Sequence, residues 1–332
     1  MNKRRFDGLF HDMERLRVGV LGDFCLDVYW EADMLKSQLS RETAHYTLPV
    51  VRERISLGGA GNAAQNIAAV FPVRLFAFGV TGNDWRENVL LNLLHGINAD
   101  TSGFVRDRER FTNAYIKPLR RGLTDELTED ARLDFEPQAE LSQATERALL
   151  DRLNERMPEL DVLCVCDQLT YGCVTHAVRG FVCSGRHKPA ILADSRERIG
   201  LYKNVIIKPN DIEACRTLDL PIGADVARVK TIARKLEQRT GKPVIVTTGG
   251  EGCVVAENGE ATHVPAFPVP PPIDICGAGD TFMAVAACAI AAGAALTEAA
   301  WLANAAAALT VRQLHTTGTT TRDALYEMCT ED

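Results

Sequence analysis

The sequence lacks the features that mark several classes of protein. It has ten cysteines but no C-x-x-C pair, and because zinc sites usually need such a spacing, we expect no structural metal site. Its 37 basic and 44 acidic side chains give a formal charge of -7 without long runs of one sign, which argues against a nucleic-acid partner or an anionic membrane surface. No glycine fingerprint follows the first predicted strand, which argues against a dinucleotide-binding oxidoreductase.

Long hydrophobic runs are also missing. The longest apolar tract, residues 282–296, is rich in small residues and too short to cross a bilayer. The basic N-terminus runs into a mixed polar segment without the apolar core of a signal peptide. Most cysteines lie within apolar segments, as expected for reduced, buried thiols. These features predict a cytoplasmic protein without a membrane partner.

The sequence does contain a regular alternation of strands and helices. With 332 residues, 46% of them hydrophobic, the chain can bury a large core. Strand patterns are predicted at residues 17–22, 73–79, 161–166, 189–193, 204–209 and 243–248, and helical patterns at 6–16, 84–95, 140–157, 173–185, 225–238, 278–293 and 296–311. This alternation predicts an α/β fold, with a doubly wound, mostly parallel sheet and helices on both faces.

Two segments interrupt the alternation. Residues 31–57 mix β-forming side chains with charges and have no helical period. Within residues 108–136, strand patterns flank a polar stretch. We interpret both segments as parts of a small β-rich lid, and we expect one domain over residues 1–332.

A glycine-rich turn stands directly before the alanine-rich helix near the C-terminus. Residues 274–280 read D-I-C-G-A-G-D. The unpaired N–H groups at a helix N-terminus favour an anion, and Asp280 at that point could take a proton from a hydroxyl. The alternative is structural, with glycines that only form the turn and an acid that only caps the helix. Taken alone, the turn leaves both interpretations open.

Other polar residues are expected at the carboxyl ends of strands, where open α/β sheets bind ligands. Asp27 follows the first strand, and Asn62 and Asn66 share one face of the helix that begins after G-G-A-G-N. Those glycines permit either a close approach to a ligand or tight helix packing. Asn210 and Glu213 have the spacing of a capping box, so a purely structural role is also open for them.

In this order the motifs resemble the ribokinase-like, or PfkB-type, family of carbohydrate kinases over essentially the whole chain. The paired signatures are G-G-A-G-N-A-A at 58–64 and D-I-C-G-A-G-D at 274–280, with N-x-x-E at 210–213 and T-x-G-x-x-G at 247–252 between them. Within the family the chain is most similar to the kinases of D-glycero-D-manno-heptose 7-phosphate, with which it shares Gly22-Asp23, Leu26-Asp27, R-L-D-F-E at 132–136 and the late Gly318-Thr319. In many of those proteins a nucleotidyltransferase domain is fused to the kinase, and we expect none here.

The sequence departs from the family pattern in two places. Threonine usually follows the first acid of the second signature, whereas Ile275 and then Cys276 follow it here. The lid segment at residues 39–51 is longer than the related segment, and no proline follows Ser40. Because the lid closes over the sugar, the identity of the substrate is where the resemblance is weakest.

The resemblance implies that the γ-phosphoryl group of ATP is transferred to a hydroxyl of a sugar or sugar phosphate, with a heptose 7-phosphate as one candidate. Asp280 would be the base, and the N–H groups of Gly277, Ala278 and Gly279 would stabilise the transferring group. The sugar side is expected at Asp27, Gly58, Gly59, Asn62 and Asn66. The nucleotide side is expected at Asn210, Glu213, Thr247, Gly249, Gly252 and Asn304.

The same resemblance implies metal ions, lid contacts and an assembly. Glu213 would hold Mg²⁺ through water, and Asp274 would lie near a monovalent cation such as K⁺. A phosphorylated sugar would need cationic side chains, and the lid offers Arg41, Arg52, Arg54, Arg110, Lys117 and Arg120. We expect two or three of them at most to touch a substrate. Lids of this family often pair between subunits, so a homodimer through the lid is also expected.

Two alternatives stay open at this stage. The first is a kinase for another sugar or for a nucleoside, because one scaffold serves many alcohols. The second is a catalytically silent protein that binds a sugar or a nucleotide, for which the altered lid is the main argument. The intact G-A-G-D and N-x-x-E motifs argue against the second alternative.

Overall fold

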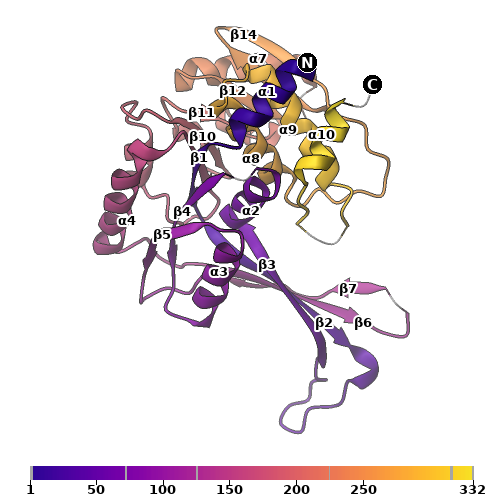
Figure 1. Cartoon of the computed structure of the whole chain (residues 1–332). Helices are drawn as coiled ribbons and strands as arrows, with labels where there is room; N and C mark the ends of the chain where they lie inside the picture. Colours follow the sequence, from indigo (N-terminus) through magenta and orange to yellow (C-terminus); the bar gives the residue numbers. More distant parts are fainter. Residues whose placement is uncertain (1–2, 72, 125, 224, 315–316, 331–332) are drawn as a thin grey trace.

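Two β-sheets organise the chain (Figure 1). The computed structural model describes residues 3–71, 73–124, 126–223, 225–314 and 317–330. The larger sheet has nine strands in the order β14-β13-β12-β11-β10-β9-β1-β4-β5, and the smaller sheet has the order β3-β2-β6-β7 with β8 paired to β6. The smaller sheet is the predicted lid, and it extends away from the body that the larger sheet and the helices form.

The nine-stranded sheet is parallel from β12 to β5, and only β13 and β14 run antiparallel to their neighbours. Its strands are β1 Arg17–Gly22, β4 Arg74–Thr81, β5 Asp100–Arg106, β9 Val162–Asp167, β10 Ala190–Ser195, β11 Ile206–Ile207, β12 Val244–Thr247, β13 Cys253–Glu257 and β14 Glu260–Val264. The predicted mostly parallel sheet is therefore confirmed, and β12 and β13 form an antiparallel pair at one end of it.

Helices cover both faces of this sheet. The α-helices are α1 Lys3–Met13, α2 Ala60–Val70, α3 Trp85–Gly96, α4 Gln143–Arg156, α5 His176–Val182, α6 Asp211–Thr217, α7 Val226–Thr240, α8 Ala278–Ala291, α9 Leu296–Thr310 and α10 Arg322–Thr330. Two buried clusters result, one with side chains from α1, α2, α8, α9 and α10 and the other with side chains from α4 to α7.

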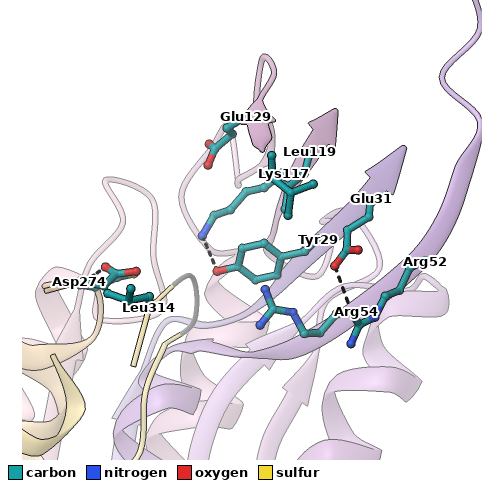
Figure 2. Close-up of a pocket in the computed structure, with 11 residues that line it drawn as sticks. Tyr29, Glu31, Arg52, Arg54, Lys117, Leu119, Glu129, Asp274 and Leu314 are labelled. Atoms are coloured by element: carbon teal, nitrogen blue, oxygen red, sulfur yellow. Dashed lines mark hydrogen bonds and ion pairs between the residues drawn. The ribbon is translucent and has the colours of Figure 1, made fainter. Parts of the chain in front are cut away.

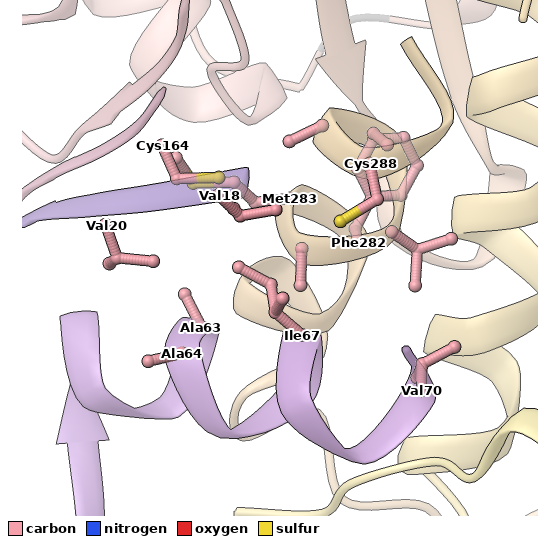
Figure 3. Packing of buried hydrophobic residues seen from close by; sticks show 14 of the residues in the cluster. Val18, Val20, Ala63, Ala64, Ile67, Val70, Cys164, Phe282, Met283 and Cys288 are labelled. Carbon is pink, nitrogen blue, oxygen red and sulfur yellow. The ribbon is translucent and has the colours of Figure 1, made fainter. Parts of the chain in front are cut away.

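Strand alternation separates the two clusters. Val18 and Val20 of β1 point into the cluster under α2 and α8, whereas Leu21 points into the opposite cluster. Figure 3 shows Val18 and Val20 near Ile67 of α2 and Met283 of α8. The buried positions of α8 are mostly alanine, so α2, α9 and the sheet can approach it closely. This packing fixes the N-terminus of α8 at the edge of the sheet.

The lid strands are β2 Phe24–Asp33, β3 Val50–Gly59, β6 Ala114–Arg121, β7 Leu127–Glu129 and β8 Leu133–Phe135. Strand β2 is antiparallel to β3 and parallel to β6. The lid begins at residue 24 rather than at about 31, because buried Phe24, Leu26 and Val28 alternate into the main core while the strand already belongs to the lid sheet. Between β2 and β3, residues 37–49 form an exposed arm that a Leu39–Tyr46 bridge closes.

Several predicted boundaries differ from the structure. Strand β11 has only two residues, because Pro209 cannot donate a ladder hydrogen bond. Helix α5 begins after the Thr175 cap and is shorter than the predicted helix at 173–185. Residues 249–251 form a short 3₁₀ turn, and edge strand β5 was not predicted. Among the described residues, no helix has the length and apolar character needed to cross a bilayer.

Candidate active site

Asp280 lies in the first turn of α8, directly after the glycine-rich turn. Gly277 precedes the helix in the left-handed region with φ 79°, and a Cβ there would lie 2.7 Å from Asn62 Nδ2. The same Asn62 Nδ2 donates to Asp280 Oδ2 at 2.8 Å. Gly277 is therefore required both by its backbone conformation and by the close approach of the amide that orients Asp280.

The environment of Asp280 suits a general base. Burial raises the pKa of its carboxyl to about 6, and the charges of Asp194 and Asp27 act in the same direction. The hydrogen bond from Asn62 and the charge of Lys208 oppose this rise. A carboxylate with a pKa near the working pH is a stronger proton acceptor than an ordinary aspartate.

A buried ion pair lies under the glycine-rich turn. Lys208 is 3% exposed, and its Nζ is 3.1 Å from Asp194 Oδ2. Burial alone would lower the pKa of Lys208, but Asp194, Glu213 and Asp280 raise it above its ordinary value, so the side chain stays charged. Sequence reasoning missed both residues, although a lysine and an aspartate at the ends of apolar strands are unusual enough to indicate a site.

A cavity of about 240 Å³, here the inner cavity, joins the sugar-side residues to Asp280. Asp27 and Gly59 enter it from the start of β2 and the end of β3, and Asn62 from α2. Its lining residues are Asp23, Cys25, Asp27, Gly59, Asn62, Tyr115, Lys117, Arg132, Gln168, Leu169, Arg196, Cys276, Gly277, Asp280 and Thr317. The structure thus brings together five predicted site residues from distant parts of the sequence, namely Asp27, Gly59, Asn62, Gly277 and Asp280.

Asp27 pairs with the lid cation Lys117 in the wall of the inner cavity. Asp27 Oδ1 is 3.1 Å from Lys117 Nζ, and the same Nζ donates to the Tyr29 hydroxyl at 3.1 Å. Gly58 does not line the cavity, but a Cβ at this position would lie 2.7 Å from Asp27 Oδ2. Gly58 therefore makes room for the carboxylate and does not itself face a ligand.

Asn66, which we expected on the sugar side, lies behind the site. It is fully buried, its Nδ2 donates to the Asn62 carbonyl at 3.0 Å, and its Oδ1 accepts from Thr281 Oγ1 at 3.0 Å. These bonds tie α2 to α8 through polar side chains. Asn66 therefore positions Asn62, and through it Asp280, because an inaccessible amide cannot contact a substrate.

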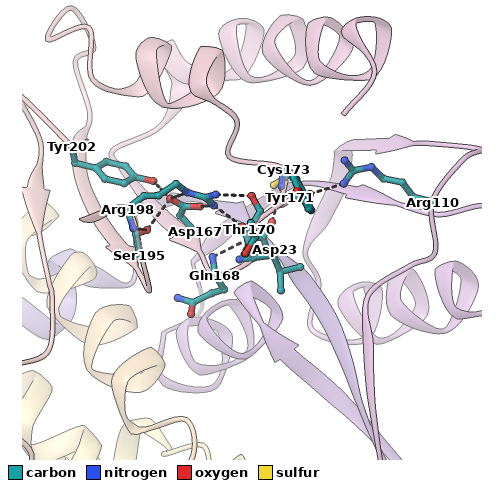
Figure 4. A network of polar contacts seen from close by, with 11 residues as sticks. Asp23, Arg110, Asp167, Gln168, Thr170, Tyr171, Cys173, Ser195, Arg198 and Tyr202 are labelled. Atoms are coloured by element: carbon teal, nitrogen blue, oxygen red, sulfur yellow. Dashed lines mark hydrogen bonds and ion pairs between the residues drawn. The ribbon is translucent and has the colours of Figure 1, made fainter. Parts of the chain in front are cut away.

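Asp23, the other acid after β1, has a structural role. Its carboxylate accepts from the backbone N–H groups of Gln168, Leu169 and Cys173 at 2.7 to 2.9 Å. Figure 4 shows this group beside Asp167, which binds Ser195, Arg198 and Tyr202. The network holds the loop after β9, which forms one wall of the inner cavity.

The predicted nucleotide-side residues follow β11 and β12. Asn210 and Glu213 form a complete capping box at α6, with N···O distances of 2.8 Å in both directions. Burial raises the pKa of Glu213 to about 7, and Asp194 adds to this rise. The capping role is thus present, and it fixes the Glu213 carboxyl beside Lys208 and Asp194.

The turn after β12 is shaped by its glycines. Thr247 bridges to Asn210, so the two nucleotide-side segments lie side by side. Gly249 and Gly252 have φ of 58° and 98°, and a Cβ on Gly252 would lie 2.2 Å from the Val264 carbonyl oxygen. Asn304 Nδ2 donates to the Val264 and Pro265 carbonyls, both at 3.1 Å. Asn304 thereby fixes the segment after β14.

One expectation for the glycine-rich turn needs revision. The Ala278 N–H donates to the Ile275 carbonyl at 3.2 Å, so in this conformation it is not available to an anion. Asp274 accepts from the Cys276 N–H at 3.0 Å, and its own N–H donates to the Val311 carbonyl at 2.8 Å. The first acid of the signature thus shapes the turn.

The six predicted lid cations differ in whether they line a cavity, lie exposed or bind other parts of the chain. Arg52, Arg54 and Lys117 line a second cavity between the lid and the C-terminal part of the chain, described below (Figure 2). Arg41 is exposed on the arm. Arg110 donates to the Tyr171 carbonyl at 2.8 Å, and Arg120 pairs with Asp130. The structure therefore leaves three of the six cations in position to meet a ligand.

The inner cavity is also lined by Tyr115, Arg132 and Arg196, which sequence reasoning did not select as site residues. Tyr115 donates to Glu136 Oε1 at 2.6 Å, and Arg132 forms two 2.6 Å bonds with Asp134. Arg196 follows β10 and is exposed. Arg132 stands in a motif that supported the family resemblance, whereas nothing in the local sequence separates Arg196 from other surface arginines.

The acids around Lys208 fit a divalent cation held through water. In the described part of the chain, no three His, Cys, Asp or Glu side chains are arranged to bind a metal directly. Yet Asp194 raises the pKa of both Glu213 and Asp280, and an added cation would offset this repulsion. Mg²⁺ usually keeps several waters and needs only one or two carboxylates.

Comparisons with known proteins agree with this geometry. A model of the pfkB family of carbohydrate kinases matches residues 26–322. The bifunctional protein HldE of Geobacter sulfurreducens is 28% identical over 322 residues, which cover 95% of this chain and 64% of that protein. The chain therefore spans less than two thirds of that relative's length.

Solved structures show the same fold. Ribokinase from Thermotoga maritima matches with a TM-score of 0.67 and 20% identity, over 95% of this chain and 100% of that one. Phosphofructokinase-2 from Escherichia coli, in complexes with fructose-6-phosphate and with potassium, matches with a TM-score of 0.74 and 19% identity, over 94% and 98%. Since the family model covers most of the chain, the chain belongs to the pfkB family of carbohydrate kinases, phosphotransferases that use ATP.

Proposed function

We propose that this kinase transfers the γ-phosphoryl group of ATP to a hydroxyl of a phosphorylated sugar, with a heptose 7-phosphate as the leading candidate. The observation that carries the proposal is the inner cavity, which is lined by Asp280 at the N-terminus of α8 and also by Asp27 and the lid cations Lys117 and Arg132. A carboxylate that accepts sugar hydroxyls, a base and an anion-binding helix end are the groups that this reaction needs.

In the proposed reaction, the acceptor hydroxyl lies against Asp280 and its oxygen attacks the γ-phosphorus. A new P–O bond forms, the bond to the β-phosphate oxygen breaks, and the hydroxyl proton moves to Asp280. The N–H groups of Gly277 and Gly279 stabilise charge on the transferring group, and Lys208 lies beneath them. The Ala278 N–H does not contribute, because it donates to the Ile275 carbonyl.

On the nucleotide side, Asn210, Glu213, Thr247, Gly249 and Gly252 would form the floor under ATP, and Asn304 would line the adenine pocket. Mg²⁺ would neutralise the β- and γ-phosphates, and Glu213 would hold its waters. The family resemblance makes Asp274 the candidate for holding a monovalent cation, and phosphofructokinase-2 from Escherichia coli has been solved in complex with potassium.

The substrate class rests on two supports. Lys117, Arg132 and Arg196 line the same cavity as Asp27 and Asp280, so an acceptor that carries a phosphate would meet compensating charge. The resemblance to heptose-phosphate kinases, together with the similarity to HldE, selects a heptose phosphate among such acceptors. The alternatives are a kinase for an unphosphorylated sugar or nucleoside and a catalytically silent binding protein.

The test is a panel of sugars, sugar phosphates and nucleosides assayed for ADP release with MgATP, followed by ³¹P NMR of the product. We expect the highest kcat/KM for a sugar phosphate. Activity only with an unphosphorylated hexose or a nucleoside would contradict the substrate assignment. Tight sugar binding without ADP release from any acceptor would favour the silent binding protein.

We also propose that two copies associate through their lids. The lid exposes large apolar side chains, among them Leu39, Tyr46, Leu48, Val50 and Val51, and exposed sheet edges of this kind gain from being covered. Light scattering should give twice the chain mass, and Tyr46→Asp with Val51→Asp should give the mass of one chain. A monomer in the unchanged protein would contradict this assembly.

A further inference from the structure

The inner face of the lid carries its polar residues in rows that cross three strands. In the first row, which we call the acid row, Asp27 of β2 lies beside Tyr115 of β6. In the second row, which we call the cation row, Tyr29 of β2 lies between Arg54 of β3 and Lys117 of β6. Residues two apart on a strand share a face, so the two rows are about 7 Å apart.

Tyr29 positions both cations of the cation row. The guanidinium carbon of Arg54 lies 4.3 Å from the centre of its ring, and Lys117 Nζ lies 4.7 Å from the same point. Lys117 also donates to the Tyr29 hydroxyl at 3.1 Å. Since Tyr29 is only 8% exposed, the ring is fixed and holds two positive charges on the inner face of the lid.

The cation row opens into a cavity of about 460 Å³, here the outer cavity (Figure 2). Across from the lid, Figure 2 shows Asp274 and Leu314 in its wall, and Cys276 also lines it. Lys117 and Cys276 line both the outer and the inner cavity. A single ligand can therefore extend from Asp280 past Asp27 into the outer cavity.

The acids of the outer cavity lie outside the cation row. Glu31 is one row farther out and is 3.6 Å from Arg52 and 3.5 Å from Arg121. Glu129 is on β7, and Asp274 is on the opposite wall. Within the cation row itself, Arg54 and Lys117 carry positive charge, and Asp27 lies 3.1 Å from Lys117 Nζ at one end of the row.

We propose that the cation row binds the phosphate group of the acceptor, with Arg54 and Lys117 as its two charged ligands. This inference rests on the proposed function and deepens it, since it specifies which acceptors fit. The phosphate would lie one row, about 7 Å, beyond the hydroxyls held by Asp27, so it sits at the far end of the sugar from the reacting hydroxyl. An acceptor phosphorylated next to the reacting hydroxyl does not fit.

The test compares one sugar phosphate with its unphosphorylated sugar in the unchanged protein and in Arg54→Gln. We expect Arg54→Gln to lower kcat/KM for the sugar phosphate by roughly ten- to hundredfold, the effect of losing one charge-assisted hydrogen bond. The value for the free sugar should change by less than about threefold, because that acceptor has no phosphate group for Arg54 to bind.

Arg120→Gln is the matched control. It removes the same charge from the same lid, but its side chain alternates to the opposite face of β6 and pairs with Asp130. We expect Arg120→Gln to leave kcat/KM unchanged for both the sugar phosphate and the free sugar. Equal losses for both acceptors in Arg54→Gln, or no loss for the sugar phosphate, would overturn the inference.

A binding measurement separates failure of the inference from failure of the proposed function. If the unchanged protein releases no ADP with any sugar phosphate, the proposed function fails. The dissociation constant of the sugar phosphate, measured by calorimetry in the unchanged protein and in Arg54→Gln, then tests the inference alone. A roughly tenfold or larger weakening supports it, and equal dissociation constants overturn it. Arg54→Lys, which keeps the charge without the planar fork, should fall between the two.

Discussion

The edge of the nine-stranded sheet and the lid use charge in different ways. At the sheet edge, Lys208 and Asp194 form a pair that is nearly inaccessible, and the neighbouring acids have raised pKa values because they are buried together. In the lid, pairs such as Arg120 with Asp130 are exposed, with side-chain exposures of 44% and 28%. Buried charge provides reactivity at the sheet edge, whereas exposed charge in the lid can be exchanged for a ligand.

The strongest way to test this contrast is to remove one cation from each region. Lys208→Met leaves Asp194 buried without its partner, so we expect the free energy of unfolding to fall by about 3–5 kcal/mol. Arg120→Met in the lid should lower it by less than about 1 kcal/mol, the usual value of an exposed pair. Urea denaturation at pH 7 measures both values.

Lys235→Met provides the control for the chemical change, since this lysine is exposed on α7. It should alter the free energy of unfolding by no more than about 0.5 kcal/mol. If Lys208→Met cost as little as Lys235→Met, the buried pair would not organise the sheet edge as described.

The second prediction concerns the loss of stability that results from burying the ionised carboxyl of Asp280. The folded-state pKa of Asp280, about 6, is above its ordinary value of 3.8, so the contribution of this group to stability is fully present below pH 3.8 and is lost as the pH rises from 3.8 through 6. Asp280→Asn removes this loss and should raise the free energy of unfolding at pH 8 by up to about 3 kcal/mol.

The same variant should approach the stability of the unchanged protein as the pH falls towards 4. Denaturation curves at pH 8, 6 and 4.5 measure this convergence. A difference that stays constant with pH would mean that the burial of the Asp280 charge is not the cause.

The smallest predicted effect lies in the lid arm. Residues 40–45 are joined mainly by local bonds, such as Ser40 N–H to the His45 carbonyl at 2.9 Å, and most are exposed. Replacing them with a two-residue turn should change the free energy of unfolding by less than about 0.5 kcal/mol. A loss above about 2 kcal/mol would show that the arm belongs to the folded core, and would contradict the view of the lid as an exposed region.

Local patterns predicted the parts of the site that depend on neighbouring residues. The turn at Gly277 requires a left-handed backbone, and the spacing of Asn210 and Glu213 is that of a capping box, so each signal is contained in a few residues. The doubly wound sheet followed from the alternation of strand and helix patterns for the same reason. These features could be predicted because short segments largely determine them.

Long-range contacts could not be predicted in this way. The Lys208–Asp194 pair forms only because β10 and β11 are neighbours in the sheet, and Asn66 faces Thr281 rather than a ligand because α2 packs on α8. The start of the lid at residue 24 depends on which side of β2 meets the core. In each case the deciding partner is distant in the sequence, so no local pattern contains it.

The central claim is that Asp280 is the catalytic base, and turnover of Asp280→Asn tests it most directly. We expect kcat to fall by roughly a hundredfold or more, the scale for losing a general base, while the dissociation constants of ATP and of the sugar change by less than about threefold. Asp151→Asn, on an exposed position of α4, is the matched control and should keep full turnover. Near-normal kcat in Asp280→Asn would contradict the account.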